Sequence, residues 1–110
     1  MAGSGAVYEA ISATLGALPG IHEKRMFGGT CFMLEGNMVC GAMKGWAMVR
    51  VGKMNEARAL AFPGVEHAMP SGRKMAGFVR IHEDAMAEEE TVLPALLDMA
   101  LGFVATLPAK

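Results

Sequence analysis

Glycine-centred turns limit what this chain can fold into more than any other feature of the sequence. Three of them divide residues 22–51 into short apolar stretches: Gly28-Gly29, Glu35-Gly36 and Lys44-Gly45. Apolar runs bounded by such turns are typical of hairpin-connected strands. We predict strands over 30–34, 37–43 and 46–51, with residues 22–27 as a candidate extra strand. Segments so close in sequence usually pair with their neighbours, which predicts an antiparallel meander.

Helical periodicity flanks this region on both sides. Residues 6–18 repeat apolar side chains at helical spacing before Pro19-Gly20, and Ser4 is a candidate N-cap. Further along, the pattern predicts a short helix over 53–62, irregular chain over 65–74, a last strand over 77–82, and helix over 84–90 and 92–107. The apolar stripe of the short helix would be formed by Met54, Ala57, Leu60 and Ala61. Pro94 fits only the first turn of the last helix.

These elements predict an α+β fold in a single domain that spans residues 1–110. It would be a two-layer α/β sandwich in the order α-β-β-β-α-β-α, with the helices on one face of an antiparallel meander sheet. The other face would be solvated or would bind a partner. A hydrophobic fraction of 53% in 110 residues excludes a disordered chain.

Location and charge narrow the functional classes. We find no apolar run long enough for a membrane span, no signal-peptide pattern and only two cysteines, so we expect a cytoplasmic protein. The net charge is −1, yet residues 20–80 hold nine basic and four acidic side chains, a balance of +5. Residues 81–110 hold six acidic side chains and one lysine, a balance of −5. Such a dipolar chain can orient a partner.

Four segments carry a resemblance to a known family. They are Lys24-Arg25-Met26-Phe27-Gly28-Gly29 with the strand after it, the Glu35-Gly36 turn, Trp46 to Val51, and Ser71 to Val79. In this order they resemble the TfoX N-terminal domain family over roughly residues 6–105. The resemblance implies a two-layer α/β fold and a regulatory role, because the family is named from a regulator of natural competence in bacteria that acts together with a transcription factor. In that regulator a C-terminal domain follows, whereas we expect this chain to be a stand-alone domain of the family.

Several basic and glycine residues are candidate contacts for a partner or an anion. Lys24 and Arg25 precede Gly28 and Gly29, and backbone amides beside glycines can bind phosphate. Arg50, Arg73 and Lys74 are candidates for a basic patch, with Arg80 near them in sequence. The alternatives are that Phe27 packs in the core beside a glycine bend and that the basic residues form an ordinary solvated face. The loop also lacks the Gly-Lys-Ser/Thr ending of a phosphate-binding loop.

The two cysteines pose a question of register. If Glu35-Gly36 is a plain two-residue hairpin loop, Cys31 lies opposite Cys40, and if the turn carries a glycine bulge, the two face opposite sides. We expect buried free thiols in preference to a redox pair. No metal-ligand spacing joins the cysteines to His22, His67 or His82, so we expect no metal and no cofactor.

Nothing in the sequence marks an enzyme active site, because no candidate nucleophile has a visible base and orienting group. The leading hypothesis is therefore a non-enzymatic regulatory module that binds a protein, with a transcription regulator as one candidate. The first alternative is nucleic-acid binding by the basic central segment, and the second is an undetected small-molecule site or enzyme. We expect no membrane partner and either a monomer or a homodimer paired through an edge strand.

Overall fold

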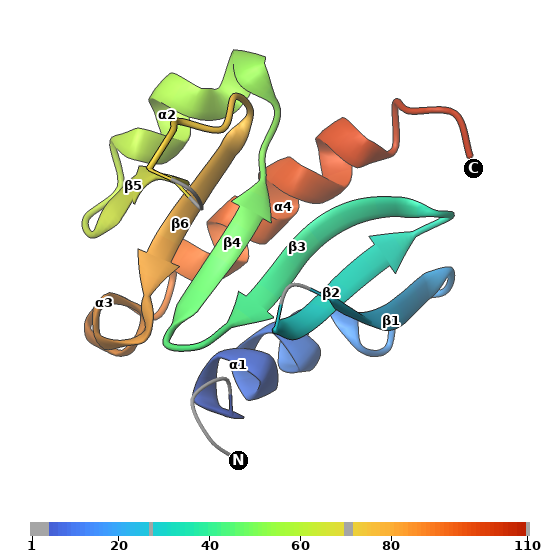
Figure 1. Ribbon diagram of the computed structural model, residues 1–110, viewed down its shortest axis with the longest axis horizontal. Coiled ribbons are helices and arrows are strands. Elements are labelled where there is room, and N and C mark those ends of the chain that lie inside the picture. Colours follow the sequence, from blue (N-terminus) through green and yellow to red (C-terminus); the bar gives the residue numbers. More distant parts are fainter. Residues whose placement is uncertain (1–4, 27, 70–71, 110) are drawn as a thin grey trace.

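A computed structural model describes residues 5–26, 28–69 and 72–109, and it has the predicted α+β architecture (Figure 1). Its sheet has six antiparallel strands in the order β1-β2-β3-β4-β6-β5. The strands are β1 (Ile21–Met26), β2 (Gly29–Leu34), β3 (Asn37–Met43), β4 (Trp46–Arg50), β5 (Val65–His67) and β6 (Phe78–His82). The helices are α1 (Gly5–Leu15), α2 (Glu56–Leu60), α3 (Glu83–Glu88) and α4 (Val92–Val104), and a 3-10 turn, η1 (Lys53–Asn55), precedes α2.

The helices share one core with one face of the sheet. In Figure 1, α4 passes behind β3 and β4, and α1 lies beside it against β3. Val7, Ile11 and Leu15 of α1 are fully buried, as their spacing predicts, whereas Leu18 lies beyond the helix and is 39% exposed. The buried residues of α4 follow the same helical period: Val92, Leu93, Leu96, Leu97, Ala100 and Val104. Burial of this apolar face supplies most of the stability of such helices.

The predicted order of elements is confirmed, and the candidate strand over 22–27 is present as β1. The structure corrects the prediction of irregular chain over 65–74, because Val65–His67 pairs with β6 as a short edge strand. Pro94 lies in the first turn of α4, as its missing N–H requires. The candidate N-cap Ser4 lies outside the described residues.

The apolar stripe that we expected on residues 53–62 is wrong except for Leu60, which is partly buried and packs against the core. Met54 is 83% exposed, Ala57 and Ala61 are exposed, and Ala59 is the residue buried against the core. The segment begins as a 3-10 turn and continues for only five α-helical residues. A rule based on 3.6 residues per turn therefore assigns the wrong face here.

A bulge in the β2–β3 hairpin decides where the two cysteines point. Leu34 pairs with Asn37, so the loop is a two-residue turn, but the register shifts by one between Phe32 and Met33. Beyond the shift, Cys31 pairs with Gly41 and Phe32 pairs with Cys40. An extra residue in one strand reverses the faces of the residues that follow. Both thiols are therefore buried and free, on opposite faces of the sheet.

Candidate functional site

The sheet face turned away from α1 and α4 is the candidate site, and we call it the free face. Alternation along the strands directs Ala47, Val49, Val79 and Ile81 into the core, where they are fully buried. The residues between them point the other way, away from α1 and α4. Because α4 passes behind the sheet in Figure 1, this face of the sheet is the one turned toward the viewer. Large apolar side chains on the free face are only partly buried: Met33, Met38, Met43, Trp46, Met48 and Phe78. Within the described part of the chain, no helix covers them.

Sulfur-containing side chains meet near the middle of the free face, above Gly41. A Cβ added there would lie 2.5 Å from the Met43 methyl carbon, 3.3 Å from that of Met38 and 3.6 Å from the Cys31 sulfur. The missing side chain of Gly41 therefore makes room for its neighbours to close over the strand. Cys31 is fully buried beneath this layer although it faces outward. Flexible thioether chains adapt readily to a binding partner.

A row of stacked polar and aromatic side chains crosses the other half of the free face. The Arg80 guanidinium lies 4.1 Å from the Trp46 ring centroid, and its N–H groups donate to Glu66 Oε1 at 3.2 and 2.9 Å. His82 packs edge-on against the same indole, with centroids 4.9 Å apart. The stacking holds Arg80 flat over the ring and the ion pair satisfies two of its donors. Trp46 is thus an anchored, partly covered aromatic rather than an open stacking platform.

Arg50 lies at the end of β4, between two aromatic rings. Its guanidinium carbon is 5.9 Å from the centroid of Phe78 and 5.5 Å from the centroid of Phe103 on α4, and it donates to the Met38 carbonyl at 3.4 Å. Arg50 is half-buried, so part of its guanidinium remains accessible to solvent. It lies at the margin of the group of partly buried methionine and aromatic side chains, which we call the apolar centre of the free face. The predicted contact residue is therefore present on the free face.

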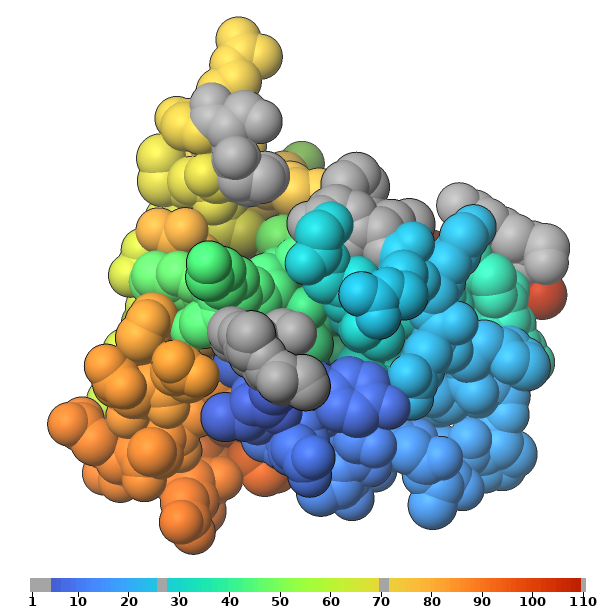
Figure 2. Space-filling model, turned by 60° about the horizontal axis from the view of Figure 1, so that its bottom comes forward, coloured from blue at the N-terminus to red at the C-terminus, as the bar shows by residue number. Residues whose placement is uncertain are grey.

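The structure does not bring the other predicted contacts together. Lys24 and Arg25 are neighbours in sequence but point to opposite faces of β1, with Lys24 on the free face beside Cys31. Arg25 shares the helix-facing side with Glu23, whose carboxylate accepts hydrogen bonds from the Tyr8 hydroxyl. Arg73 and Lys74 are exposed in the loop between β5 and β6, which projects from the body of the molecule (Figure 2). In the described part of the chain neither makes a hydrogen bond or an ion pair.

The two glycines of the first motif have a structural explanation. Gly28 makes the bend between β1 and β2 with a φ of 77°, which L side chains rarely adopt. Gly29 opens β2, and a Cβ there would collide with the carbonyl oxygen of Ala42 on β3. Close approach of the strands therefore requires glycine at this position. The expectation that Phe27 packs in the core falls outside the described residues.

The thiols are in environments that suppress their reactivity. Burial raises the pKa of Cys31, and it raises the pKa of Cys40 strongly, with a smaller contribution from the nearby Cys31 thiol. A nucleophilic cysteine needs the opposite shift. Among the described residues, no three His, Cys, Asp or Glu side chains gather closely enough to hold a metal ion, and no helix is long and apolar enough to cross a membrane.

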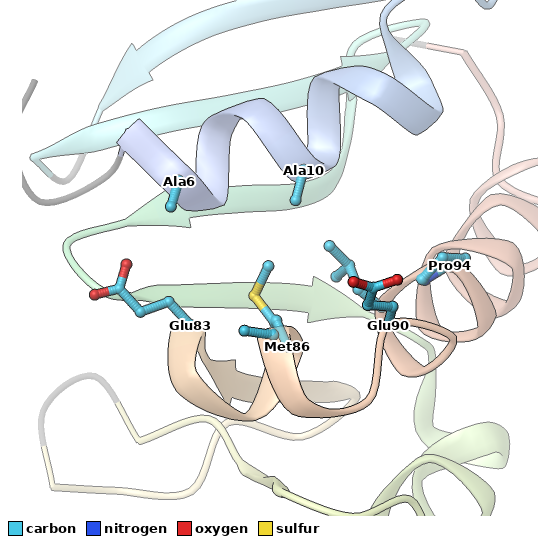
Figure 3. Close-up of a pocket in the computed structure, with 8 residues that line it drawn as sticks. Ala6, Ala10, Glu83, Met86, Glu90 and Pro94 are labelled. Atoms are coloured by element: carbon cyan, nitrogen blue, oxygen red, sulfur yellow. The ribbon is translucent and has the colours of Figure 1, made fainter.

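The described residues include those that line two open hollows on the helical side of the molecule. One, of about 270 Å³, lies between α1, α3 and the start of α4, and α1 and α3 are seen side by side in Figure 2. Figure 3 shows Glu83 and Glu90 toward its two ends, with Met86 between them and Ala6 and Ala10 opposite. The other, of about 370 Å³, lies between η1 and α4 and includes the exposed Met54. Both are broad and shallow compared with the enclosed clefts that enzymes use.

Comparison with protein-family models gives a match to the TfoX N-terminal domain over residues 13–102. The chain belongs to the TfoX N-terminal domain family. The match spans the sheet, the loop between β5 and β6, and most of α4. The family resemblance inferred from the sequence is therefore confirmed. Searches of curated proteins and of solved structures returned no match.

The later family segment has a structural role that its sequence did not reveal. The Gly77 amide donates to a carboxylate oxygen of Glu56, and the Gly77 carbonyl accepts from Gly52 N at 3.0 Å. These bonds tie the strand that follows the loop to the start of the η1–α2 segment. Residue patterns could not show this link, because it joins positions more than 20 apart through a single side chain.

Proposed function

We propose that this TfoX N-terminal domain is a non-enzymatic interaction module that binds a partner protein through its free face. One observation carries the proposal. Six large apolar side chains, four of them methionines, are partly exposed on one sheet face, and no described element packs over them. Extended apolar patches are uncommon on monomeric proteins and mark surfaces that bind partners.

The charges on the free face indicate what kind of segment would bind. Lys24, Arg50 and Arg80 lie on this face and Glu66 is the one acidic residue among its strand positions, already paired with Arg80. The apolar centre is thus bordered by net positive charge. We infer a partner segment that combines apolar anchors with Asp or Glu side chains. Complementary charge at the margin would set orientation and association rate, and burial at the centre would supply affinity.

The family supports a transcription regulator as the source of that segment, because its founding member acts together with a transcription factor. This part of the proposal depends on membership of the family and not on the geometry of the free face. The free face supports the proposal to the extent that it has adaptable methionines at its centre and the rigid Trp46–Arg80 stack at one side. Aromatic and arginine side chains in such positions are frequent energetic hot spots.

Direct nucleic-acid binding is less well supported. The basic side chains are spread over the first strand, the end of β4 and a projecting loop, and Arg80 is engaged by Glu66 and Trp46. A phosphate-binding surface would require several unengaged cations side by side, and it would lose affinity steeply with salt. Capture of a partner with and without nuclease, described next, therefore separates protein binding from nucleic-acid binding.

The test is capture from host lysate by purified protein, with and without nuclease, using two matched variants. Met48→Asp places a charge on the free face, and Met54→Asp places the same charge on an 83% exposed methionine outside it. Circular dichroism spectra would establish that both variants are folded. We expect the wild type and Met54→Asp to capture a protein that Met48→Asp does not capture. This capture should persist after nuclease treatment.

The captured protein must then bind directly. A synthetic peptide from its acidic, apolar region should compete with it, while a scrambled peptide of the same composition should not. Capture that disappears with nuclease would replace the proposal with nucleic-acid binding. Capture unaffected by Met48→Asp, or no capture at all, would contradict it.

A further inference from the structure

The helical side of the molecule carries a second, electrostatically opposite surface. The helices α1, α3 and α4 contain five acidic side chains and no lysine or arginine: Glu9, Glu83, Asp84, Glu88 and Asp98. The segment between α3 and α4 adds Glu89 and Glu90. The charged side chains that these three helices themselves contribute are therefore all acidic, whereas basic side chains predominate on the free face.

The hollow between α1, α3 and α4 lies within this acidic surface. Among the described residues that line it, the wall and floor are mainly apolar, formed by Ala6, Ala10, Met86, Ala87, Leu93 and Pro94, and the two charged residues are Glu83 and Glu90. Figure 3 shows their carboxylates at opposite ends of the hollow, with the Met86 side chain between them. The small side chains of Ala6 and Ala10 leave the space open on the α1 side.

Neither carboxylate is neutralised within the described part of the chain. No ion pair or side-chain hydrogen bond involves Glu83 or Glu90 there, although the Glu83 backbone amide donates to the Gly45 carbonyl at 2.9 Å. Lys44, in the neighbouring β3–β4 turn, is exposed and makes no ion pair with Glu83. An apolar trough of about 270 Å³ thus has an uncompensated negative charge toward each end.

We propose that this hollow is a docking site for a basic amphipathic segment of a protein. The segment would place an apolar side chain over Met86 and Leu93 and a lysine or arginine at each carboxylate. The segment is expected to be basic because the charged side chains of its partners, the described lining of the hollow and the helices α1, α3 and α4, are all acidic. With the free face, the domain would present two binding surfaces of opposite charge, which is the arrangement of an adaptor.

The test uses fluorescence anisotropy with a labelled helical peptide of leucine, alanine and lysine, and a control peptide with glutamate in place of lysine. The key variant is Glu83→Gln with Glu90→Gln. The matched control is Glu88→Gln with Glu89→Gln, which removes the same charge from exposed positions that do not line the hollow. A third variant, Ala10→Phe, fills the hollow without changing charge.

We expect the lysine peptide to bind the wild type and the glutamate peptide not to bind. The dissociation constant should rise about fivefold or more in the Glu83/Glu90 variant, which corresponds to two partly exposed ion pairs. It should change less than about twofold in the Glu88/Glu89 variant, and Ala10→Phe should also weaken binding. Circular dichroism would verify that each variant is folded.

Three outcomes would overturn the proposal. The first is that the lysine peptide fails to bind the wild type at low salt. The second is that both double variants weaken binding equally, which would indicate diffuse charge attraction. The third is self-association of the wild type, seen by analytical ultracentrifugation and abolished by the Glu83/Glu90 variant, without peptide binding. That result would assign the hollow to a second copy of this chain.

Discussion

Replacing Gly52 with alanine should destabilise the fold far more than a comparable glycine substitution elsewhere. Gly52 follows β4 with φ 90° and ψ 148°, a region essentially restricted to glycine. A Cβ there would lie 2.6, 2.8 and 3.1 Å from Cδ1, Cγ and Cε1 of Phe103, on the ring that also faces Arg50. The substitution therefore combines backbone strain with a steric collision between the end of the sheet and α4.

The two contributions can be given magnitudes. Holding a non-glycine residue in such a conformation costs about 1–3 kcal/mol, and forcing an extra carbon into a packed contact costs about 1–3 kcal/mol. We expect Gly52→Ala to lose about 4 kcal/mol of unfolding free energy. Gly72 also has a positive φ, 78°, but nothing lies within 4 Å of an added Cβ. Gly72→Ala should therefore lose only about 1 kcal/mol.

Urea denaturation followed by circular dichroism measures both values, and Phe103→Ala completes a double-mutant cycle. Removing the ring removes the collision, so the double variant should be less destabilised than the sum of the two single variants by about 1–3 kcal/mol. Equal losses for Gly52→Ala and Gly72→Ala, or simple additivity with Phe103→Ala, would refute this account of how the sheet end packs on α4.

Three further predictions concern single side chains. Burial raises the pKa of Cys40, so the folded state keeps the thiol proton at a pH at which the unfolded chain releases it. The free energy of unfolding should therefore fall as pH rises above about 8.5, by up to about 1.4 kcal/mol per pH unit. Cys40→Ala should reduce this pH dependence in urea titrations. Asn37 is 3% exposed and its side-chain amide donates to the Pro108 carbonyl at 2.9 Å, so Asn37→Ala should lose about 1–2 kcal/mol and accelerate amide exchange near the C-terminus. Arg80→Lys should lose about 1 kcal/mol and change Trp46 fluorescence, because an ammonium group cannot reproduce the flat stacking; an unchanged emission spectrum would count against the stack.

The sequence was sufficient for the larger elements because they follow strong local rules. The spacing of Val7, Ile11 and Leu15 specifies one helical face, and glycine turns separate strands that pair with their neighbours. It was insufficient for β5, whose three residues form a strand only because β6 offers an open edge. The exposed Met54 is a similar case, since tertiary packing and not periodicity orients so short a helix.

The candidate site was predictable only in part. Arg50 lies on the free face as its place in β4 predicts. Lys24 and Arg25 cannot contact one ligand together once their segment forms a strand, because adjacent residues of a strand point to opposite faces of the sheet. The Trp46–Arg80 stack could not be predicted, since it requires β6 to pair with β4 although the η1–α2 segment, β5 and a loop lie between them in the sequence. Likewise the cysteine geometry depends on a bulge that no turn signal marks.

The most direct test of the central claim is amide chemical-shift mapping of the isotope-labelled domain with its captured partner. The claim predicts that the largest changes fall on free-face positions of β2, β3, β4 and β6, including Met48 and Arg80, and that Met48→Asp abolishes them. Changes confined to the helical side, with β3 and β4 unaffected, would contradict it.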